Sequence, residues 1–303
     1  HNDQHHFNAK SHSKKFKKIH GSLIFEGAAS YFNRGAASFN DDISAWDTSN
    51  VVTMCKMFHG ASAFNQPLGA WRVDNVTDMH AMFQGASSFN QPLNDWRVNN
   101  VTHMGWMFAG AASFNQPLND WRVDSVTIMG GMFRGASAFN GPIGAWRVDK
   151  VKNMSKMFER ASSFNQPIGN WRVDKVTNMG NMFLDAKSFN QPLNDWRVDK
   201  VTNMINLFKN ASAFDQPLSD WRVDNVTNMC AMFAGASSFN QPIGDWNVER
   251  VKSMENMFSG AYNFNMGWDI RRDCRTTNML GRGDDGRLAM QKMRTEGICC
   301  TIS

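Results

Sequence analysis

A tryptophan recurs every 25 residues from Trp46 to Trp246 without a break. A fixed period of this length is typical of repeat architectures, in which each unit is one coil that stacks on its neighbours. The sequence FNQPLNDWRV occurs at 89–98, 114–123 and 189–198, so the units are close copies of one another. Because one unit cannot bury its apolar side alone, the pattern predicts a single solenoid of about nine to ten coils over residues 22–268, including an N-terminal cap.

One unit, residues 64–88, shows two kinds of apolar spacing. Residues 71–73 alternate between apolar and polar side chains, which predicts a short β-strand. The apolar residues within 76–86 recur at helical spacing, with Thr77 as a candidate N-cap and Gly85 as a candidate stop. The unit is therefore predicted to contain a strand followed by about two turns of α-helix or 3₁₀-helix.

The apolar residues form columns along the repeat. Seventeen of the 21 Met and nineteen of the 23 Phe occupy four positions of the unit, and nine of the 11 Trp occupy a fifth. Stacked coils would bury each column, and each side chain would contribute about 1.5–3 kcal/mol. The sequence FNQP marks a turn into the strand, because Pro fixes φ and keeps the preceding residue extended.

The Asn of FNQP forms a column of its own, from Asn40 to Asn265, and Asp215 is the single departure from it. Amide side chains repeated at one position of a stack can bond to backbone groups on the adjacent coil. The column therefore predicts an asparagine ladder along the turn.

The net charge of +5 belongs to the ends of the chain. Residues 1–20 contain five Lys and one Asp, and residues 266–303 contain seven basic and five acidic residues, so the repeats between them carry a net charge of −1. We expect residues 1–21 to be a disordered basic segment and residues 269–303 to be an irregular cap with a flexible tail. No run of about 18 apolar residues is present, so no transmembrane segment is predicted.

The repeat pattern WxVxxVTxMxxMFxGASxFNQPL resembles the BspA-like leucine-rich repeat surface proteins, which carry the tandem bacterial surface protein repeat. The resemblance covers about residues 22–268. It implies an α/β repeat fold: a right-handed leucine-rich-repeat-like solenoid with a parallel β-sheet on the concave side and short helices or 3₁₀ turns on the other. It also implies cell-surface adhesion through binding of proteins or other cells, with no catalytic residues. The Arg-Val-Asp step after Trp and the absence of a visible signal or wall anchor depart from the bacterial members.

Two polar columns are the candidate binding face, predicted to point outward from the strand. We call them the Arg–Asp stripe, and its residues are Arg72, Asp74, Arg97, Arg122, Asp124, Arg147, Asp149, Arg172, Asp174, Arg197, Asp199, Arg222 and Asp224. Arg guanidinium groups suit carboxylates, sulfates or phosphates. One hypothesis is therefore that the stripe binds an extended protein or glycan ligand. The alternative is that the two columns neutralise each other and relieve repulsion between stacked like charges.

Enzymatic function is not expected. Most of the eight His lie near the N-terminus, and none shares a zinc-type spacing with Cys. No phosphate-binding glycine loop and no nucleophile motif is present. We predict no cofactor and no metal site. Nucleic acid is not an expected partner, because acidic residues accompany the Arg column and the array has no net positive charge.

The cysteines favour different hypotheses in different parts of the chain. Cys55 and Cys230 occupy one repeat position seven units apart, so they cannot pair with each other. The last residues read CCTIS, which fits prenylation of Cys300 and palmitoylation of Cys299. This alternative makes the protein an intracellular, membrane-associated interaction scaffold. Five Asn-x-Ser/Thr sites would instead suit a secreted protein: Asn75, Asn100, Asn153, Asn210 and Asn225.

Overall fold

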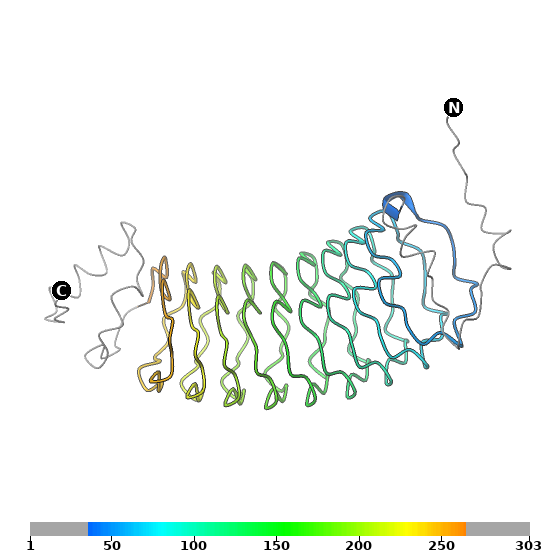
Figure 1. The fold of residues 1–303 in the computed structure, drawn as a ribbon. Coiled ribbons are helices and arrows are strands. Elements are labelled where there is room, and N and C mark those ends of the chain that lie inside the picture. Colours follow the sequence, from blue (N-terminus) through cyan, green and yellow to red (C-terminus); the bar gives the residue numbers. More distant parts are fainter. Residues whose placement is uncertain (1–35, 265–303) are drawn as a thin grey trace, which may run out of the picture.

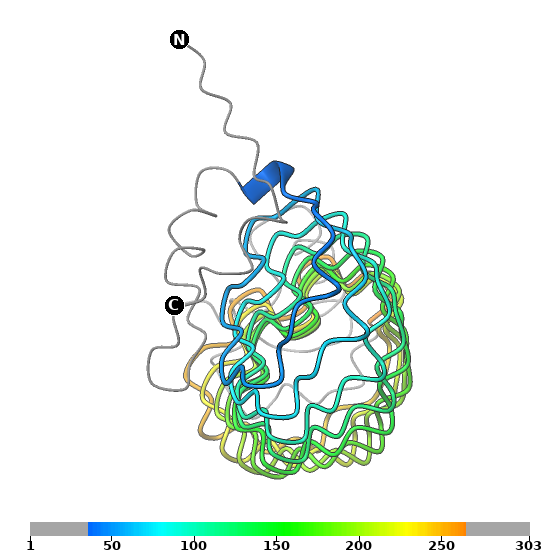
Figure 2. The ribbon, with the colours of Figure 1, turned by 90° about the vertical axis from the view of Figure 1, so that its right-hand side faces the viewer.

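The computed structural model describes residues 36–264. Nine coils of 25 residues, numbered from coil 1 (39–63) to coil 9 (239–263), lie side by side in one row (Figure 1). Seen along the row, the coils overlie one another and share one closed outline (Figure 2). The predicted segments 1–21 and 269–303 lie outside the described residues, as does most of the predicted N-terminal cap.

Neighbouring coils pair in parallel, as predicted, but only at one residue each. A column of eight isolated parallel bridges runs from Thr53 paired with Asp78 to Asn228 paired with Ser253. The strand predicted at residues 71–73 is wrong, because this segment makes no backbone-to-backbone hydrogen bond to a neighbouring coil; the N–H and C=O of Arg72 bond instead to the Thr48 side chain. Across the described residues the β-pairing lies instead in the segment that was predicted to be helical.

The predicted helix within 76–86 is also wrong, and alternate N–H groups show why. The N–H of Met82 closes a turn onto Met79 O at 3.2 Å, whereas the N–H of Phe83 donates to Met107 O on the next coil at 2.8 Å. The N–H of Gly85 likewise donates to Ala109 O at 2.7 Å. Some N–H groups of this segment thus bond to the next coil, as in a parallel strand, and those between them close a tight turn within their own coil. In the part of the chain that the structure describes, the only helix is the 3₁₀-helix η2, Ala36–Ser38.

Two columns of left-handed residues impose this alternation. Ala81 has φ 52° and Gly85 has φ 75°, and a right-handed helix cannot continue through either residue. The first column contains Lys56, Ala81, Trp106, Gly131, Lys156, Asn181, Asn206, Ala231 and Asn256. The second contains Gly60, Gly85, Gly110, Gly135, Arg160, Asp185, Asn210, Gly235 and Gly260. The chain therefore turns twice within four residues on every coil.

The apolar columns form one continuous core, as predicted. Phe83 lies 5.4 Å from Phe108 and 4.1 Å from Phe89, both on the next coil, measured between ring centroids. Trp96 and Trp121 are parallel within 2° at 6.4 Å. These rings are almost completely buried, so each coil supplies the surface that covers its neighbour.

The tryptophan column also carries a hydrogen bond that burial alone does not explain. The indole Nε1–H of Trp96 donates to Leu68 O at 3.0 Å, and the equivalent bond recurs from Trp71 to Trp246. Each acceptor belongs to the preceding coil, 28 residues back. The buried indole donor is thus satisfied by a neighbouring coil, which fixes the lateral position of that coil.

The asparagine ladder is confirmed. The backbone N–H of Asn90 donates to Asn65 Oδ1 at 2.9 Å, and this contact repeats from Asn65 to Asn240. Asp215 fits because the ladder uses an oxygen acceptor: Asn240 N–H donates to Asp215 Oδ1 at 2.9 Å. A carboxylate therefore replaces the amide without loss of the bond.

Candidate binding surface

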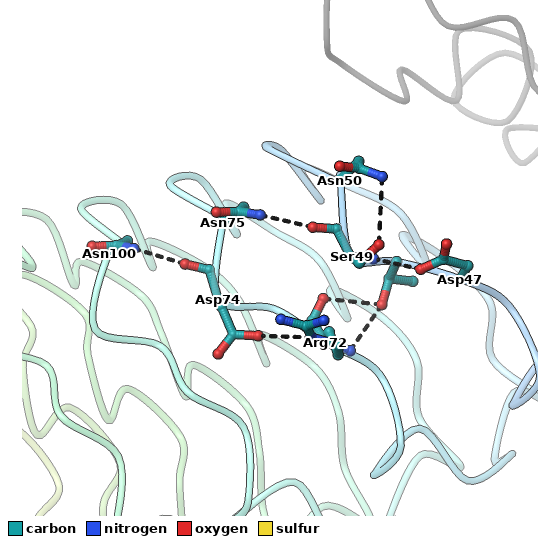
Figure 3. A network of polar contacts seen from close by, with 8 residues as sticks. Asp47, Ser49, Asn50, Arg72, Asp74, Asn75 and Asn100 are labelled. Carbon is teal, nitrogen blue, oxygen red and sulfur yellow. Dashed lines mark hydrogen bonds and ion pairs between the residues drawn. The ribbon is translucent and has the colours of Figure 1, made fainter.

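The Arg–Asp stripe runs along an exposed corner of the row of coils. Figure 3 shows Arg72 directed toward Asp74, with 3.4 Å between Arg72 Nε and Asp74 Oδ2. The Arg side chains that form ion pairs in this stripe are 70–79% exposed. Ion pairs this exposed contribute about 0–1 kcal/mol each, so the stripe is not a major source of stability.

On coils 4 to 6 the stripe becomes a continuous ladder. Arg147 lies 3.5 Å from Asp124 of the preceding coil and 3.5 Å from Asp149 of its own coil. Arg172 repeats the arrangement at 3.6 Å from Asp149 and 3.6 Å from Asp174. In six of the seven ion pairs of the stripe, the nearest guanidinium nitrogen is Nε. The acidic partner therefore contacts the Nε end of the guanidinium, which is the end nearest the backbone.

At this corner, side-chain donors rather than backbone N–H groups connect each coil to the preceding one. Asn75 Nδ2 donates to Ser49 O at 2.7 Å, and Asn100 Nδ2 donates to Asp74 O at 2.7 Å (Figure 3). Asn225 Nδ2 makes the same bond to Asp199 O at 2.7 Å. The residues of the Arg–Asp stripe thus repeat from coil to coil, but they do not lie on the column of β-bridges. The alternation of apolar and polar residues had assigned them to a strand, whereas the β-bridges lie in another segment.

A second group of polar and aromatic side chains lies on the β-bridge segment. Trp106 has φ 60°, and a Cβ added to Gly131 on the next coil would meet the Trp106 ring at 2.8 Å. The guanidinium carbon of Arg134 lies 5.5 Å from the ring centroid and the Lys156 ammonium lies 5.9 Å from it. Arg134 Nε also contacts the buried Glu159 at 3.0 Å. The indole is therefore held in place by a glycine and two cations.

A histidine pair lies close to this group, on coils 2 and 3. The rings of His80 and His103 are 4.7 Å apart, and His103 Nδ1 lies 3.7 Å from Asp78 Oδ1. His80 Nδ1 is buried and has no hydrogen-bond partner. Burial, followed by the neighbouring His103, lowers the pKa of His80 below its ordinary value. His80 is therefore held neutral more strongly than an exposed histidine.

The remaining site predictions have separate outcomes. Cys55 and Cys230 are free thiols and do not pair with each other. The candidate lipidation residues Cys299 and Cys300 lie outside the described residues. Across residues 36–264, no three His, Cys, Asp or Glu side chains are placed to hold a metal ion. Over the same range, no helix has the length and apolarity needed to cross a bilayer.

Sequence reasoning missed two features of the surface. One is the Trp106 group, and the other is a row of exposed lysines, Lys150, Lys175 and Lys200, next to the Arg–Asp stripe on coils 5 to 7. Both are departures from the repeat consensus, since most coils carry other residues at these positions. Comparing repeats with one another, rather than reading what they share, would have found them.

These observations define a class of protein: a closed-coil solenoid built from 25-residue repeats, with a nearly constant core and a polar corner that varies between coils. Three overlapping segments, residues 24–121, 107–210 and 191–287, match the family described as "Mycoplasma protein of unknown function, DUF285". The chain belongs to this family. No curated protein matches the sequence.

Solved structures that are similar to the chain include other coiled repeat proteins. A leucine-rich cell surface protein from Faecalibacterium prausnitzii is 12% identical, with a TM-score of 0.36, over 84% of this chain and 81% of that one. A leucine-rich repeat protein from Bacteroides ovatus is 9% identical, with a TM-score of 0.23, over 71% and 69%. A chain of the Drosophila Toll–Spätzle complex is 10% identical, with a TM-score of 0.29, over 69% of this chain and 35% of that one. These TM-scores describe a loose likeness, and the solenoid rests on the contacts within this chain.

Proposed function

We propose that the protein is a non-enzymatic recognition module of the cell surface, which binds an extended anionic protein segment or glycan along the Arg–Asp stripe. The repeated geometry of the stripe supports this function. A solenoid presents equivalent side chains at regular intervals, and such a surface suits a partner that is itself extended.

The observation that carries the proposal is the way in which the arginines are held. Asp149 contacts both Arg147 and Arg172 through their Nε atoms. Both Nη groups of Arg147 remain for a carboxylate or a sulfate, as does Nη1 of Arg172, whose Nη2 lies 3.6 Å from Asp174. Such an anion binds the outer end of a guanidinium with two parallel hydrogen bonds. A partner can therefore bind without displacing the aspartates, and the exposure of these arginines provides access.

The alternative of mutual neutralisation makes a different prediction. If the stripe only balances charge, its arginines contribute little to binding of any kind. Combined charge reversal of Arg122, Arg147 and Arg172 to Glu separates the two hypotheses. We expect the variant to keep its thermal unfolding midpoint within a few degrees, because exposed pairs contribute about 0–1 kcal/mol each.

The measurement is binding to arrays of carboxylated glycans, sulfated glycans and acidic peptides, first with the parent protein and then with the variant. We expect the parent to bind a subset of extended anionic probes and the triple variant to lose that binding. Unchanged affinity in a folded triple variant would reject the stripe as the recognition surface. A replacement of the same arginines by Lys is the matched control, since it keeps the charge and removes the fork.

A further inference from the structure

Three consecutive coils differ from the others next to the Arg–Asp stripe. At the position occupied by Asn75, Asn100 and Ser125 on coils 2 to 4, coils 5 to 7 carry Lys150, Lys175 and Lys200. All three lysines are exposed. Lys152 adds a fourth exposed ammonium on coil 5. We call these four residues together with Arg147, Arg172 and Arg197 the basic ridge.

The lysines replace a structural hydrogen bond. On coils 2, 3 and 8 the residue at this position is an Asn whose Nδ2 donates to a carbonyl of the preceding coil at 2.7 Å. On coil 9 it is Arg250, whose Nη1 donates to Asn225 Oδ1 at 2.8 Å. Among the described residues, the ammonium groups of Lys150, Lys175 and Lys200 form no hydrogen bond or ion pair. Three adjacent coils thus lose a contact between coils and gain unpaired charge, which is typical of a functional site.

The charge balance of this segment differs from that of the rest of the stripe. The basic ridge has seven cationic side chains, and the acidic residues beside them are Asp149, Asp174 and Asp199. The matched positions on coils 2 to 4 hold three arginines and only two aspartates, with no lysine. The positive potential is therefore concentrated on coils 5 to 7, although the array as a whole is close to neutral. Arg197 adds to it, because it forms no ion pair within the described residues.

We propose that the basic ridge is the binding site for a linear anionic polysaccharide that carries carboxylate or sulfate groups. This inference rests on the proposed function and assigns it a ligand class and a place. Equivalent side chains of successive coils repeat in register, with the buried Trp146 and Trp171 rings 6.1 Å apart and Trp171 and Trp196 6.5 Å apart. The cations are therefore expected at regular intervals from coil to coil, which suits a linear polymer with regularly spaced anions.

The acidic column decides between a polysaccharide and a nucleic acid. Asp149 and Asp174, whose side chains are 34% and 38% exposed, stand between an arginine and a lysine in the sequence. Carboxylates accept hydrogen bonds from hydroxyl groups, which a polysaccharide carries on its sugar rings and a DNA backbone lacks. The ridge also carries no aromatic side chain on which bases would stack. A polymer with both hydroxyl and anionic groups matches both columns.

The test uses the full chain and four immobilised probes: polygalacturonate, dextran sulfate, neutral dextran and single-stranded DNA. The main variant, Lys150→Asn with Lys175→Asn and Lys200→Asn, restores the residue that other coils have at this position. We expect it to bind the preferred anionic polysaccharide at least about tenfold more weakly than the parent, with a shallower dependence on salt. The two anionic polysaccharides distinguish carboxylate recognition from sulfate recognition, and neutral dextran should not bind.

A gain-of-function variant keeps the proposal testable if the first one unfolds. Replacing Asn75, Asn100 and Ser125 by Lys places a second lysine row next to Arg72, Arg97 and Arg122. We expect this variant to bind more polysaccharide per molecule than the parent protein.

The outcomes separate this inference from the proposed function. If the folded lysine variant binds as well as the parent while the Arg→Glu variant does not, the ridge is rejected and the stripe remains. If neither variant loses binding, both proposals fail. If single-stranded DNA binds as tightly as the polysaccharides and depends equally on the lysines, the ligand class assigned here is wrong.

Discussion

The indole Nε1 of Trp121 donates to Leu93 O, 28 residues earlier in the chain, at 2.8 Å. The same carbonyl also accepts the backbone N–H of Trp96 at 3.0 Å. One carbonyl thus closes a turn within its own coil and fixes the tryptophan of the next. This double use gives a physical reason for Trp at every position of the column from Trp46 to Trp246.

The first prediction concerns this donor. Replacing Trp121 by Phe removes the indole N–H and keeps an aromatic ring in the stack. Because Leu93 O keeps the bond from Trp96, we expect a loss of about 0.5–1.5 kcal/mol in the free energy of unfolding. Trp121→Ala should cost about 3–5 kcal/mol, since it also leaves a cavity. Denaturant unfolding measures both changes, and equal losses in the two variants would contradict the assigned role of the donor.

The second prediction concerns the asparagine ladder. Asn165 Oδ1 accepts the N–H of Asn190 at 2.9 Å and the Nε2–H of Gln191 at 3.0 Å. Because only the oxygen is used, Asn165→Asp should stay within about 0.5 kcal/mol of the parent at neutral pH. Asn165→Ala leaves a partly buried N–H without its acceptor and should cost about 1–3 kcal/mol. If unfolding experiments show that the Asp variant is as unstable as the Ala variant, the ladder depends on the amide nitrogen instead.

The third prediction concerns the fit between Trp106 and Gly131. Gly131→Ala and Gly135→Ala both place Ala at a left-handed residue, which costs about 1–2 kcal/mol. Only at Gly131 does the new Cβ meet the indole, at 2.8 Å, since the nearest atom at Gly135 is 3.7 Å away. We expect Gly131→Ala to be the more destabilising by about 1–3 kcal/mol.

A double-mutant cycle checks the cause of this difference. In a Trp106→Ala background the ring is absent, so Gly131→Ala should cost no more than Gly135→Ala. A difference that persists in that background would exclude the indole as its source. Ala81 and Ala231 occupy the same position of the repeat with φ 52° and 51°, so the backbone itself accepts Ala there.

The fourth prediction concerns pH. The pKa of His80 is lowered in the folded protein, first by burial and then by His103, so the folded state disfavours the charged form. The unfolded chain therefore binds a proton more readily, and stability falls as the pH drops through the unfolded pKa of about 6.5 toward the lower folded value. We expect His80→Ser to unfold at a temperature that falls less than that of the parent on acidification from about pH 7.5 to about pH 5.

Serine is the residue that coil 5 has at this position, as Ser155, so the variant copies a native coil. His59→Ser, which removes a different histidine, serves as the control, because the lowered pKa and the buried ring nitrogen belong to His80. Parallel pH profiles for the parent and His80→Ser would show that His80 does not contribute to the acid sensitivity.

The core and the ladder were predictable from sequence because both depend on what the repeats share. The regular spacing of Trp96 and Trp121 implies stacking in register, and the constant Asn column implies a bond that every coil repeats. The local backbone was not predictable in the same way. Turns that close every three or four residues place Met79, Met82 and Ala86 on one side, as a helix would. Apolar spacing alone therefore does not distinguish a helix from a series of tight turns.

The left-handed residues were the missing information. Asn181, Asn206 and Asn256 lie in the first left-handed column, and Asn and Gly are the residues that adopt this conformation most readily. Ala81, Trp106 and Lys156 lie in the same column, and because they are neither Asn nor Gly, the column does not show the composition expected of a left-handed position. The Arg–Asp stripe was assigned to a strand at residues 71–73, whereas the parallel pairing lies in another segment, and its role as a binding face stays a prediction. The basic ridge was overlooked because an average over repeats removes it.

The two sets of hydrogen bonds between coils run in opposite directions. Phe83 donates toward the following coil, to Met107 O, whereas Asn90 and Trp96 donate toward the preceding one. Each layer is therefore both donor and acceptor on each of its two faces. Removing or duplicating a whole 25-residue layer would recreate the same interface on either side, so the length of such a molecule can change in single steps while its thickness and internal packing stay constant.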